Sequence, residues 1–367
     1  MLRQRIHSKE QSDNEQIGNE AQDVQEPKKK WYLILLKVLC GLFFTVYIVI
    51  PTIYYCCPTV RRHTIFLNYV SLPLPHNLSE PQKFGLRCSR NFYVESENKI
   101  KMGVWHVPSK SALKFCKGGE MEAGKEFADG RPIFLYLHGN SGTRGANHRV
   151  LLYKLLTDTV DVHIVTFDYR GFADSTNYPP SVKGLEHDSA VMFNWVKQHQ
   201  KNSQIYIWGH SLGTAVAVRL ASRLCKSEDK PAAVVLEAPF TSTKDAAMYY
   251  PLTLFHRYMP FFDKLFLDPM MDEETGFDSE KQIIDITTPL LILHAEDDNL
   301  IPFELGERLH QKALKGRPKN LPPPIFITYD YDFDYGHKHI HRDPNLPGIV
   351  REFLEGKLQS KFIKKTS

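Results

Sequence analysis

Six short apolar runs, separated by helical patterns, constrain the fold of this 367-residue chain more than any other feature. The runs are IFLYL (133–137), VHIVTF (162–167), QIYIW (204–208), AAVVLE (232–237), LLILH (290–294) and IFITY (325–329). Nearly continuous apolar runs of this length are typical of strands buried on both faces, and strands that alternate with helices form a mostly parallel sheet. The sequence therefore predicts an α/β fold whose ligands bind beyond the carboxyl ends of the strands.

A tight turn places one serine at such a carboxyl end. The sequence GHSLG (209–213) follows the run that ends at Trp208 and precedes a helical pattern. In a strand, turn and helix of the form G-x-S-x-G, small residues let the chain reverse sharply, and the serine hydroxyl stands above the sheet. Ser211 is therefore the candidate nucleophile. An ordinary turn with a helix-capping serine is the alternative.

A serine nucleophile needs a histidine to accept its proton and an acid to orient that histidine. In this architecture the acid follows a late strand and the histidine follows the last strand. After the run at 290–294 comes AEDDNLIP, in which Asp298 is the preferred acid because the pattern Asp-x-x-hydrophobic-Pro begins there. Asp297 is expected to cap the loop or the following helix. The alternative is that both acids only make turns.

Three histidines follow the last apolar run, and His337 is the preferred base. Gly336 allows a turn just past the strand, so the ring of His337 can lie over the sheet toward the serine. His339 and His341 alternate with it and have a metal site as an alternative role. No further ligand at suitable spacing completes such a site, so no metal is expected.

The tetrahedral intermediate of acyl transfer needs two N–H donors directed at its oxyanion. One is the backbone N–H of Leu212, directly after the serine. The second is expected from the loop HGNSG (138–142), where Asn140 is our choice; a simple glycine-assisted turn is the alternative. No glycine-rich phosphate loop is present, so no cofactor is expected. The net charge is only +4 and basic residues do not gather with aromatics, so nucleic acid is not an expected partner.

The amino-terminal part contains a candidate membrane span. From Trp31 to about Tyr55 the sequence is apolar apart from Lys37, and aromatic residues stand at both ends. A helix of this length crosses the roughly 30 Å hydrocarbon layer at about 1.5 Å per residue. We therefore expect a disordered cytosolic tail over 1–30 and a transmembrane helix over 31–55. The long polar leader disfavours a cleaved signal peptide, and a buried core helix is the soluble alternative.

Charge around the span favours a cytosolic amino terminus and a lumenal catalytic domain, because three lysines (28–30) precede the span and two arginines follow it. Asn77-Leu78-Ser79 is a glycosylation sequon on the lumenal side, so Asn77 is the candidate acceptor. Outside the span and its edge the chain has three cysteines, which allow at most one disulfide without showing which pair forms it. They are Cys88, Cys116 and Cys225.

The remaining segments have looser patterns. A proline-rich connector over 56–90 leads to two alternating runs around the polar residues 96–99, which predict an antiparallel hairpin. The interval at about 240–285 is longer than one crossover helix requires and concentrates aromatic residues, so we expect a lid that meets an acyl chain or a membrane. Packing of a small subdomain is the alternative. The aromatic residues are Tyr249, Tyr250, Phe255, Tyr258, Phe261, Phe262 and Phe266.

Taken in chain order, the motifs resemble one known family. They are LYLHGN, DYRGFADS, WGHSLG, LEAPF, LLILHAEDDNLIP and GHKHIH, behind one apolar span. Over about residues 55–360 the chain resembles the α/β-hydrolase domain-containing protein 12 group. The resemblance implies an α/β-hydrolase fold with Ser211 as nucleophile, Asp298 as acid and His337 as base, in agreement with the residues derived above. It also implies a lysophosphatidylserine and monoacylglycerol lipase of the endoplasmic reticulum membrane with a lumenal catalytic domain.

We therefore expect an α/β-hydrolase domain over 91–360, with a short tail at 361–367. Its expected partners are a lipid substrate and the membrane, and its expected reaction is hydrolysis of a lysophospholipid or monoacylglycerol ester through an acyl-enzyme on Ser211. Two alternatives stay open at this point. One is an acyl thioesterase that uses the same three residues, and the other is a catalytically silent, membrane-anchored scaffold.

Overall fold

The computed structural model describes residues 27–70, 77–227, 229–250, 253 and 256–363. Most of the expected tail, residues 1–26, lies outside the described residues, as do Phe255 of the expected lid and the last four residues. The chain divides into two compact units, residues 1–56 and residues 57–367. We describe each unit by itself.

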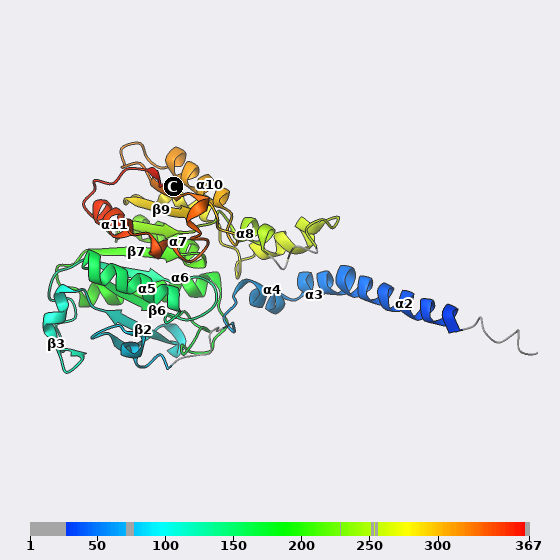
Figure 1. The fold of residues 1–367 in the computed structure, drawn as a ribbon, viewed down its shortest axis with the longest axis horizontal. Coiled ribbons are helices and arrows are strands. Elements are labelled where there is room, and N and C mark those ends of the chain that lie inside the picture. The colour runs from blue at the N-terminus through cyan, green and yellow to red at the C-terminus, as the bar shows by residue number, and fades with distance from the viewer. Residues whose placement is uncertain (1–26, 71–76, 228, 251–252, 254–255, 364–367) are drawn as a thin grey trace, which may run out of the picture. The chain divides into compact units, whose positions relative to one another are not determined.

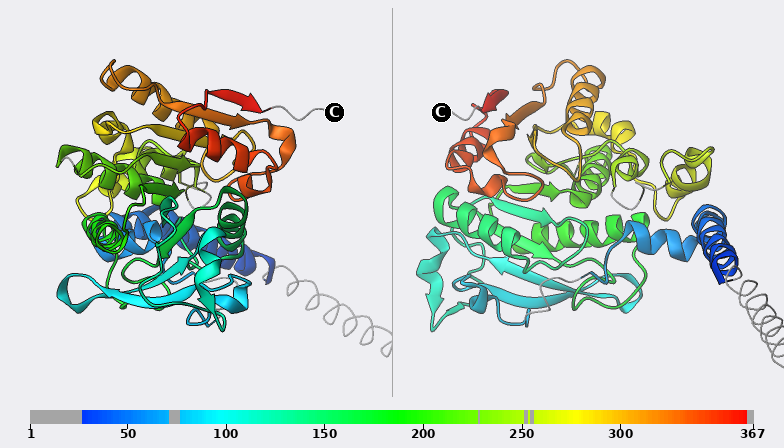
Figure 2. Two further views of the ribbon diagram at one scale, coloured as in Figure 1. Left: turned by 90° about the vertical axis from the view of Figure 1, so that its left-hand side faces the viewer. Right: turned by 45° about the vertical axis from the view of Figure 1, so that its right-hand side comes forward.

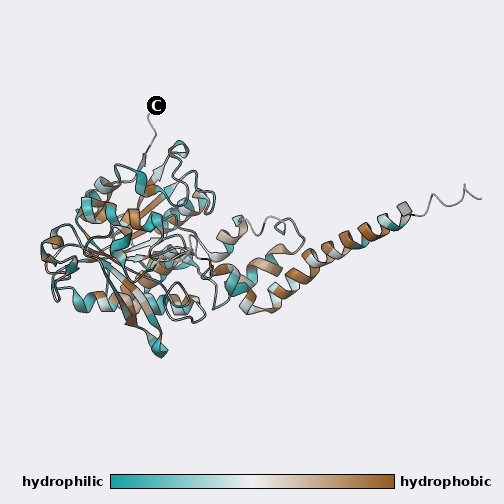
Figure 3. Ribbon diagram, turned by 60° about the horizontal axis from the view of Figure 1, so that its bottom comes forward, coloured by the Kyte–Doolittle hydropathy of each residue, from teal (hydrophilic) through white to brown (hydrophobic). Residues whose placement is uncertain are grey.

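The first unit contains one long apolar helix (Figure 3). It consists of α2 (Pro27–Phe44), a π-helical turn (Thr45–Val49) and α3 (Ile50–Cys56). The helix thus begins four residues before the predicted span. The residues Lys30–Cys56 have the length and composition of a membrane span, and this is the one such helix in the described part of the chain. The apolar helix therefore points to a membrane anchor.

Two hydroxyl groups within this helix are hydrogen-bonded inside the helix itself. The π turn ends at Val49, two residues before Pro51, which has no N–H for the regular helical bond. The hydroxyls of Thr45 and Thr52 donate to carbonyl oxygens one turn earlier, over 2.9 and 2.7 Å. These bonds satisfy both hydroxyls within the helix, as a medium without water requires.

The second unit is built on one sheet, which has nine strands in the described residues (Figure 1). Its strand order is β1-β2-β6-β5-β7-β8-β9-β10-β11. The pairs β1–β2 and β2–β6 are antiparallel and all other pairs are parallel. All six predicted runs form strands of this sheet. The strands are β1 (Arg90–Glu95), β2 (Lys101–Val107), β5 (Ile133–Leu137), β6 (His163–Phe167), β7 (Ile205–His210), β8 (Val234–Glu237), β9 (Leu290–Ala295), β10 (Ile325–Tyr329) and β11 (Lys361–Ile363).

Helices cover both faces of the sheet (Figure 2). Along β5 the side chains of Ile133, Leu135 and Leu137 join a core with α6, α7 and α10, whereas those of Phe134 and Tyr136 join a second core with α5 and α11. This alternation explains why the runs are apolar at every position. The helices of this unit are α4 (Pro58–Ile65), α5 (Asn147–Leu155), α6 (Val182–His199), α7 (Leu212–Lys226), α8 (Thr243–Tyr249), α9 (Ser279–Gln282), α10 (Phe303–Gly316) and α11 (Leu346–Leu354).

The elements that the sequence did not predict include one helix and one strand of the main sheet. Helix α4 occupies the expected connector, with Pro58 at its first turn, where a missing N–H costs nothing. Strand β11 occupies part of the expected tail and pairs in parallel with β10. Three residues are too few to give a periodic signal, and the backbone of an edge strand offers free pairing groups to any extended segment.

The interval between β8 and β9 holds α8, a π turn (Asp263–Leu267), a 3-10 turn (Asp268–Met271) and α9. Its aromatic residues divide between the two expected roles. Phe262 and Phe266 are buried, whereas Tyr258 and Phe261 are 83% and 71% exposed. Part of this segment therefore packs its own small core, and another part presents aromatic rings to the surroundings.

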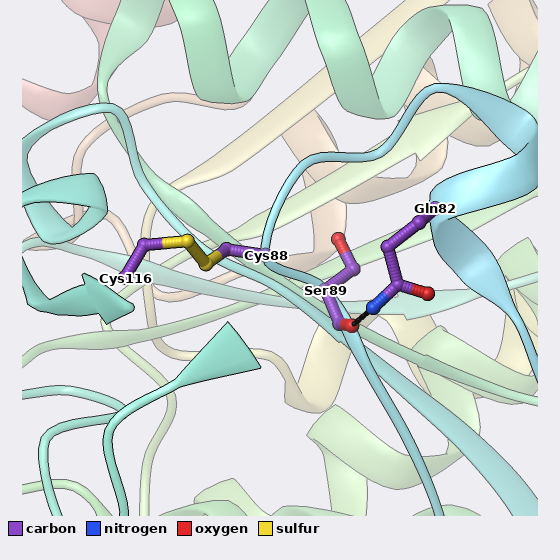
Figure 4. Close-up of a disulfide and its surroundings, with 4 residues drawn as sticks. All are labelled: Gln82, Cys88, Ser89 and Cys116. Carbon is purple, nitrogen blue, oxygen red and sulfur yellow. Dashed lines mark hydrogen bonds between the residues drawn. A yellow bond between two sulfur atoms is a disulfide. The ribbon is translucent and has the colours of Figure 1, made fainter. Parts of the chain in front are cut away.

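A disulfide joins Cys88, just before β1, to Cys116 in the two-residue strand β3 (Cys116–Lys117) (Figure 4). The two Cα atoms are 6.0 Å apart. Strand β3 pairs with β4 (Glu120–Met121) within the loop after β2. Beside the disulfide, Gln82 Nε2 donates to the carbonyl oxygen of Ser89 over 2.8 Å. Cys225 is buried and free.

Candidate active site

Ser211 lies at the turn between β7 and α7 in a strained backbone conformation, with φ 53° and ψ −121°. The two glycines of the turn are required by close backbone packing. A Cβ on Gly209 would lie 2.3 Å from the carbonyl oxygen of Gly213, and a Cβ on Gly213 would lie 2.0 Å from that of Leu137. The motif G-x-S-x-G therefore has a direct steric cause, because any larger residue would push the serine away from this position.

The three predicted residues form one chain of hydrogen bonds. Ser211 Oγ lies 2.8 Å from His337 Nε2, and His337 Nδ1 lies 2.7 Å from Asp298 Oδ2. The side chain of His337 is 7% exposed and that of Asp298 is fully buried. The residues follow β7, β9 and β10, whose carboxyl ends meet at one edge of the sheet. The parallel topology thus brings together side chains that are far apart in sequence.

Asp298 is held as a carboxylate. Burial alone would raise its pKa, but the charges and hydrogen bonds of His337 and His294 hold the pKa far below its ordinary value. Asp298 Oδ1 also accepts the backbone N–H groups of Leu300 and Ile301, both over 2.9 Å. An ionised acid with one oxygen fixed by two backbone donors leaves the other oxygen to orient the imidazole.

His294 was not among the predicted site residues. It lies in β9, fully buried, and its Nε2 is 3.3 Å from Asp298 Oδ2 and 3.0 Å from the carbonyl oxygen of Ile301. A signal for it was present, because a histidine at the end of an otherwise apolar strand requires a polar partner once it is buried. Asp298, four residues later, is that partner.

We expected Asp297 to cap its loop or the following helix, and the structure shows no side-chain cap on that helix, α10, which begins after Pro302. Asp297 Oδ2 accepts the backbone N–H of Gly336 over 2.7 Å. Gly336 has a φ of 49°, in the left-handed region that favours glycine. Asp297 therefore holds the turn that presents His337.

Two further buried groups surround the serine. His210 Nε2 donates to the carbonyl oxygen of His337 over 2.9 Å, and burial lowers the pKa of His210 well below its ordinary value, so the ring stays neutral. Glu237 accepts the backbone N–H of Ser211 with its carbonyl oxygen and the indole N–H of Trp208 with its carboxyl group, over 3.0 and 2.9 Å. Burial raises the pKa of Glu237 to about 7.

The predicted oxyanion donors belong to the turn at the serine and to a loop that touches this turn. Leu212 is the first residue of α7, where a backbone N–H has no partner within its own helix. The loop over 138–142 touches the turn, because a Cβ on Gly139 would lie 3.1 Å from Ser211 Cβ. Asn140 follows Gly139 directly, so the backbone N–H of Asn140 stays the predicted second donor.

The histidines after His337 gather no further ligands. The rings of His339 and His341 lie 5.6 Å apart. Across the parts of the chain that the structure describes, no three His, Cys, Asp or Glu side chains are grouped so that they could hold a metal ion. The geometry thus supplies a serine, an imidazole and a carboxylate in one hydrogen-bonded chain. Together with the two predicted backbone donors, this is the arrangement that acyl transfer requires.

Comparison with known proteins gives the same fold. The family described as alpha/beta hydrolase fold matches residues 132–269. An esterase from Pyrococcus furiosus superposes with a TM-score of 0.55 at 17% identity, over 78% of this chain and 97% of that one. An alpha-beta hydrolase from Vibrio vulnificus superposes with a TM-score of 0.58 at 18% identity, over 82% of this chain and 94% of that one. The second unit is an α/β hydrolase fold.

Sequence relatives are more specific. The chain is 42% identical to lysophosphatidylserine lipase ABHD12 of Rattus norvegicus over 328 residues, which cover 89% of this chain and 81% of that protein. It is 41% identical to the Danio rerio protein of the same name, over 84% of this chain and 81% of that one. It is 36% identical to protein ABHD12B of Homo sapiens, over 68% of each chain. The chain therefore belongs to the lysophosphatidylserine lipase ABHD12 family of α/β hydrolases.

Proposed function

We propose that this protein is a membrane-anchored serine hydrolase that cleaves the acyl ester of lysophosphatidylserine and of monoacylglycerols. The observation that carries the proposal is the unbroken hydrogen-bonded chain from Ser211 through His337 to Asp298, over 2.8 and 2.7 Å. A serine hydroxyl is a weak nucleophile by itself, and this chain supplies the base and the orienting acid that it needs.

In the acylation step, His337 Nε2 accepts the Ser211 hydroxyl proton while Oγ attacks the ester carbonyl carbon. The carbonyl oxygen becomes an oxyanion, which the N–H groups of Leu212 and Asn140 stabilise. Asp298 stabilises the imidazolium without taking its proton. His337 then gives that proton to the departing alkoxide as the carbon–oxygen bond breaks, and glycerol or glycerophosphoserine leaves.

In the deacylation step, His337 Nε2 accepts a proton from water, and the hydroxide attacks the acyl-enzyme carbonyl. Collapse of the second tetrahedral intermediate breaks the bond to Ser211 Oγ, which receives the proton from His337. The fatty acid leaves and the resting hydrogen-bonded chain is restored.

Two features support a single-chain lipid as substrate. The Rattus norvegicus and Danio rerio relatives are lysophosphatidylserine lipases, at 42% and 41% identity over most of their length. The apolar helix provides a membrane anchor, which keeps the site near amphiphiles that a soluble enzyme would have to extract. We assign the hydrolase domain to 91–360 and a lid to about 240–285, where exposed aromatic rings suit an acyl chain or a membrane surface.

We also propose a place in the endoplasmic reticulum membrane, with a cytosolic amino terminus and a lumenal catalytic domain. The disulfide between Cys88 and Cys116 supports an oxidising compartment. Asn77 is exposed, as a glycosylation acceptor requires. Glycosidase treatment should increase the gel mobility of the wild type and leave Asn77→Gln unchanged. A wild type insensitive to glycosidase would count against the glycosylated, lumenal placement.

The reaction is tested with a fluorophosphonate probe and a lipid assay on the full-length protein in membranes. The probe should label the wild type and not Ser211→Ala, and only the wild type should release fatty acid from lysophosphatidylserine or monoacylglycerol. Equal labelling of both proteins would remove the serine hydrolase assignment. Labelling with turnover of acyl thioesters alone would replace the lipase by a thioesterase.

A further inference from the structure

The loop that carries the second oxyanion donor is bound by a segment outside the sheet. We call residues 58–70, which comprise α4 and the five residues after it, the membrane-proximal segment. The side-chain amide of Asn140 makes two hydrogen bonds to the backbone of this segment. Its Nδ2 donates to the carbonyl oxygen of Ile65, and its Oδ1 accepts the N–H of Leu67 over 2.8 Å. The amide thus uses both its donor and its acceptor in the contact with this segment, which fixes the orientation of the side chain.

More bonds join the same two stretches of chain. The backbone N–H of Gly142 donates to the carbonyl oxygen of Val70 over 2.8 Å. Asn68 is buried, and its Nδ2 donates to the carbonyl oxygen of Gly171, just beyond β6, over 3.0 Å. The membrane-proximal segment therefore lies along the carboxyl ends of β5 and β6, bonded to both loops.

The segment is in turn fixed to the rest of the domain. Arg61 and Arg62 pair with Asp272 and Glu274, over 3.2 and 3.3 Å. Phe66 is 1% exposed and belongs to the core that includes α6 and α7. A segment held at several points is a firm support for a loop that it binds.

The loop over 138–142, which we call the oxyanion loop, has an irregular backbone that such a support would hold in place. Ser141 and Gly142 both have a positive φ, 69° and 67°, so the loop departs from regular structure directly after Asn140. A loop of this kind is not fixed by strand pairing, whereas an oxyanion donor must lie within a few tenths of an ångström of its working position.

We propose that the membrane-proximal segment positions the oxyanion loop and that the side chain of Asn140 is the positioning residue that transmits this support. The inference rests on the proposed function, in which the Asn140 backbone N–H stabilises the oxyanion. Cys57 alone separates α4 from α3 in the chain, so the segment that supports the loop directly follows the apolar helix in sequence. The backbone N–H and the side chain of one residue thus have separate tasks.

The test is Asn140→Ala in the full-length protein, assayed with lysophosphatidylserine in vesicles. The variant keeps its backbone N–H and loses both bonds to the membrane-proximal segment. We expect kcat to fall roughly tenfold to a hundredfold, because a displacement of about 1 Å costs on the order of 10²-fold. KM should change less than threefold, since the displaced donor acts mainly on the transition state. Affinity for a trifluoromethyl ketone, which forms a tetrahedral adduct on the serine, should fall by the same factor as kcat.

The matched control is Gln82→Ala. It also removes a side-chain amide that donates to a backbone carbonyl oxygen, but at Ser89, beside the disulfide. This variant should keep the kcat and the ketone affinity of the wild type. If Asn140→Ala does not fold, Asn140→Asp takes its place: it keeps an acceptor for Leu67 and loses the donor to Ile65, so kcat should fall again.

The outcomes separate the two proposals. A folded Asn140 variant whose kcat and ketone affinity lie within twofold of the wild type overturns the positioning role. If Ser211→Ala retains the hydrolysis rate of the wild type, the proposed function fails instead. A fall in thermal stability with unchanged kcat would make Asn140 a structural residue only and would also overturn the inference.

Discussion

The two sides of Ser211 are held in different ways. On the acid–base side, His337 and Asp298 are side chains that bond directly to one another over 2.7 Å from loops at the ends of neighbouring strands. On the proposed oxyanion side, the loop over 138–142 is bound by Arg149 of α5, which donates to two of its carbonyl oxygens, and by the membrane-proximal segment, which is not part of the sheet. The first arrangement is thus built on the ends of paired strands, and the second includes a support from outside the sheet.

Because of this difference, we expect changes in the segments around the domain to affect the two sides unequally. The acid–base side is fixed by parallel strand pairing and burial, so it should withstand changes in the segments around the domain. The oxyanion side should respond to any displacement of α4, because the loop has no strand partner of its own at that point. Regulation by the membrane, or damage by truncation near residue 58, would therefore act on the oxyanion side.

The largest effect is expected on the acid–base side, from Asp298→Asn. The amide removes the charge that stabilises the imidazolium and favours the wrong tautomer of His337, so kcat should fall by about 10⁴. Fatty acid release from lysophosphatidylserine measures this loss. Because Asp298 has a pKa far below its ordinary value, it stays ionised in mildly acidic solution, and the wild type should not lose this interaction there. A fall in kcat of less than tenfold would show that another acid orients the histidine.

The disulfide belongs to neither side of the serine and therefore serves as a reference for both. It joins Cys88 to Cys116 in the loop after β2. Cys88→Ser with Cys116→Ser should lower the free energy of unfolding by about 2–4 kcal/mol, because the 28-residue loop is no longer closed in the unfolded chain. Denaturant unfolding measures this change. The kcat of the folded variant should match that of the wild type, and a hundredfold loss would show that this region supports the site after all.

The pKa values of two buried carboxyl groups near the serine are shifted in opposite directions: that of Asp298 is lowered and that of Glu237 is raised. The raised pKa allows a test by pH. The pKa of Glu237 is raised to about 7 by burial, from an ordinary 4.5. The stability that its protonated form provides is complete below pH 4.5 and is lost as the pH rises through 7, a difference of roughly 3–4 kcal/mol at about 1.4 kcal/mol per pH unit. Glu237→Gln keeps an acceptor for Trp208 and cannot ionise, so it should be more stable than the wild type at pH 8 and similar at pH 4.5. Parallel pH curves of stability for the two proteins would contradict this.

Much of the fold followed from the sequence because the signals were local. Each apolar run is long enough to identify one buried strand, and the alternation of runs with helices predicts a parallel sheet with helices on both faces. Helix α4 and strand β11 were missed because each is stabilised by distant partners, Asp272 and Glu274 in one case and β10 in the other. Among Cys88, Cys116 and Cys225, no sequence rule selects the pair that bonds.

The same distinction applies to the site. Chain order and strand ends were enough to predict the places of Ser211, Asp298 and His337, and the structure brings them within hydrogen-bonding distance. The tasks of Asp297 and the Asn140 side chain were not predictable, because their partners, Gly336 and residues 65–67, lie elsewhere in the chain. A hydrogen bond between loops leaves no periodic trace in a sequence, whereas the strand that positions a loop does.

The last prediction is that the effects of substitutions on the two sides are independent. Its expected effect, a coupling energy near zero, is the smallest of the predicted effects. No hydrogen bond between described residues joins Asn140 to His337 or Asp298 directly. The contacts that link the two sides pass through the serine and through His210, which donates to the carbonyl oxygen of His337 and lies beside Gly139. The factor by which Asn140→Ala lowers kcat should then be the same in the wild type and in Asp298→Asn, with a coupling energy below about 0.5 kcal/mol. A complete cycle of four proteins, assayed with one lysophosphatidylserine, measures it. If Asn140→Ala has no further effect once Asp298 is replaced, the two sides act as one unit. The oxyanion loop would then owe its place to the histidine and not to the membrane-proximal segment.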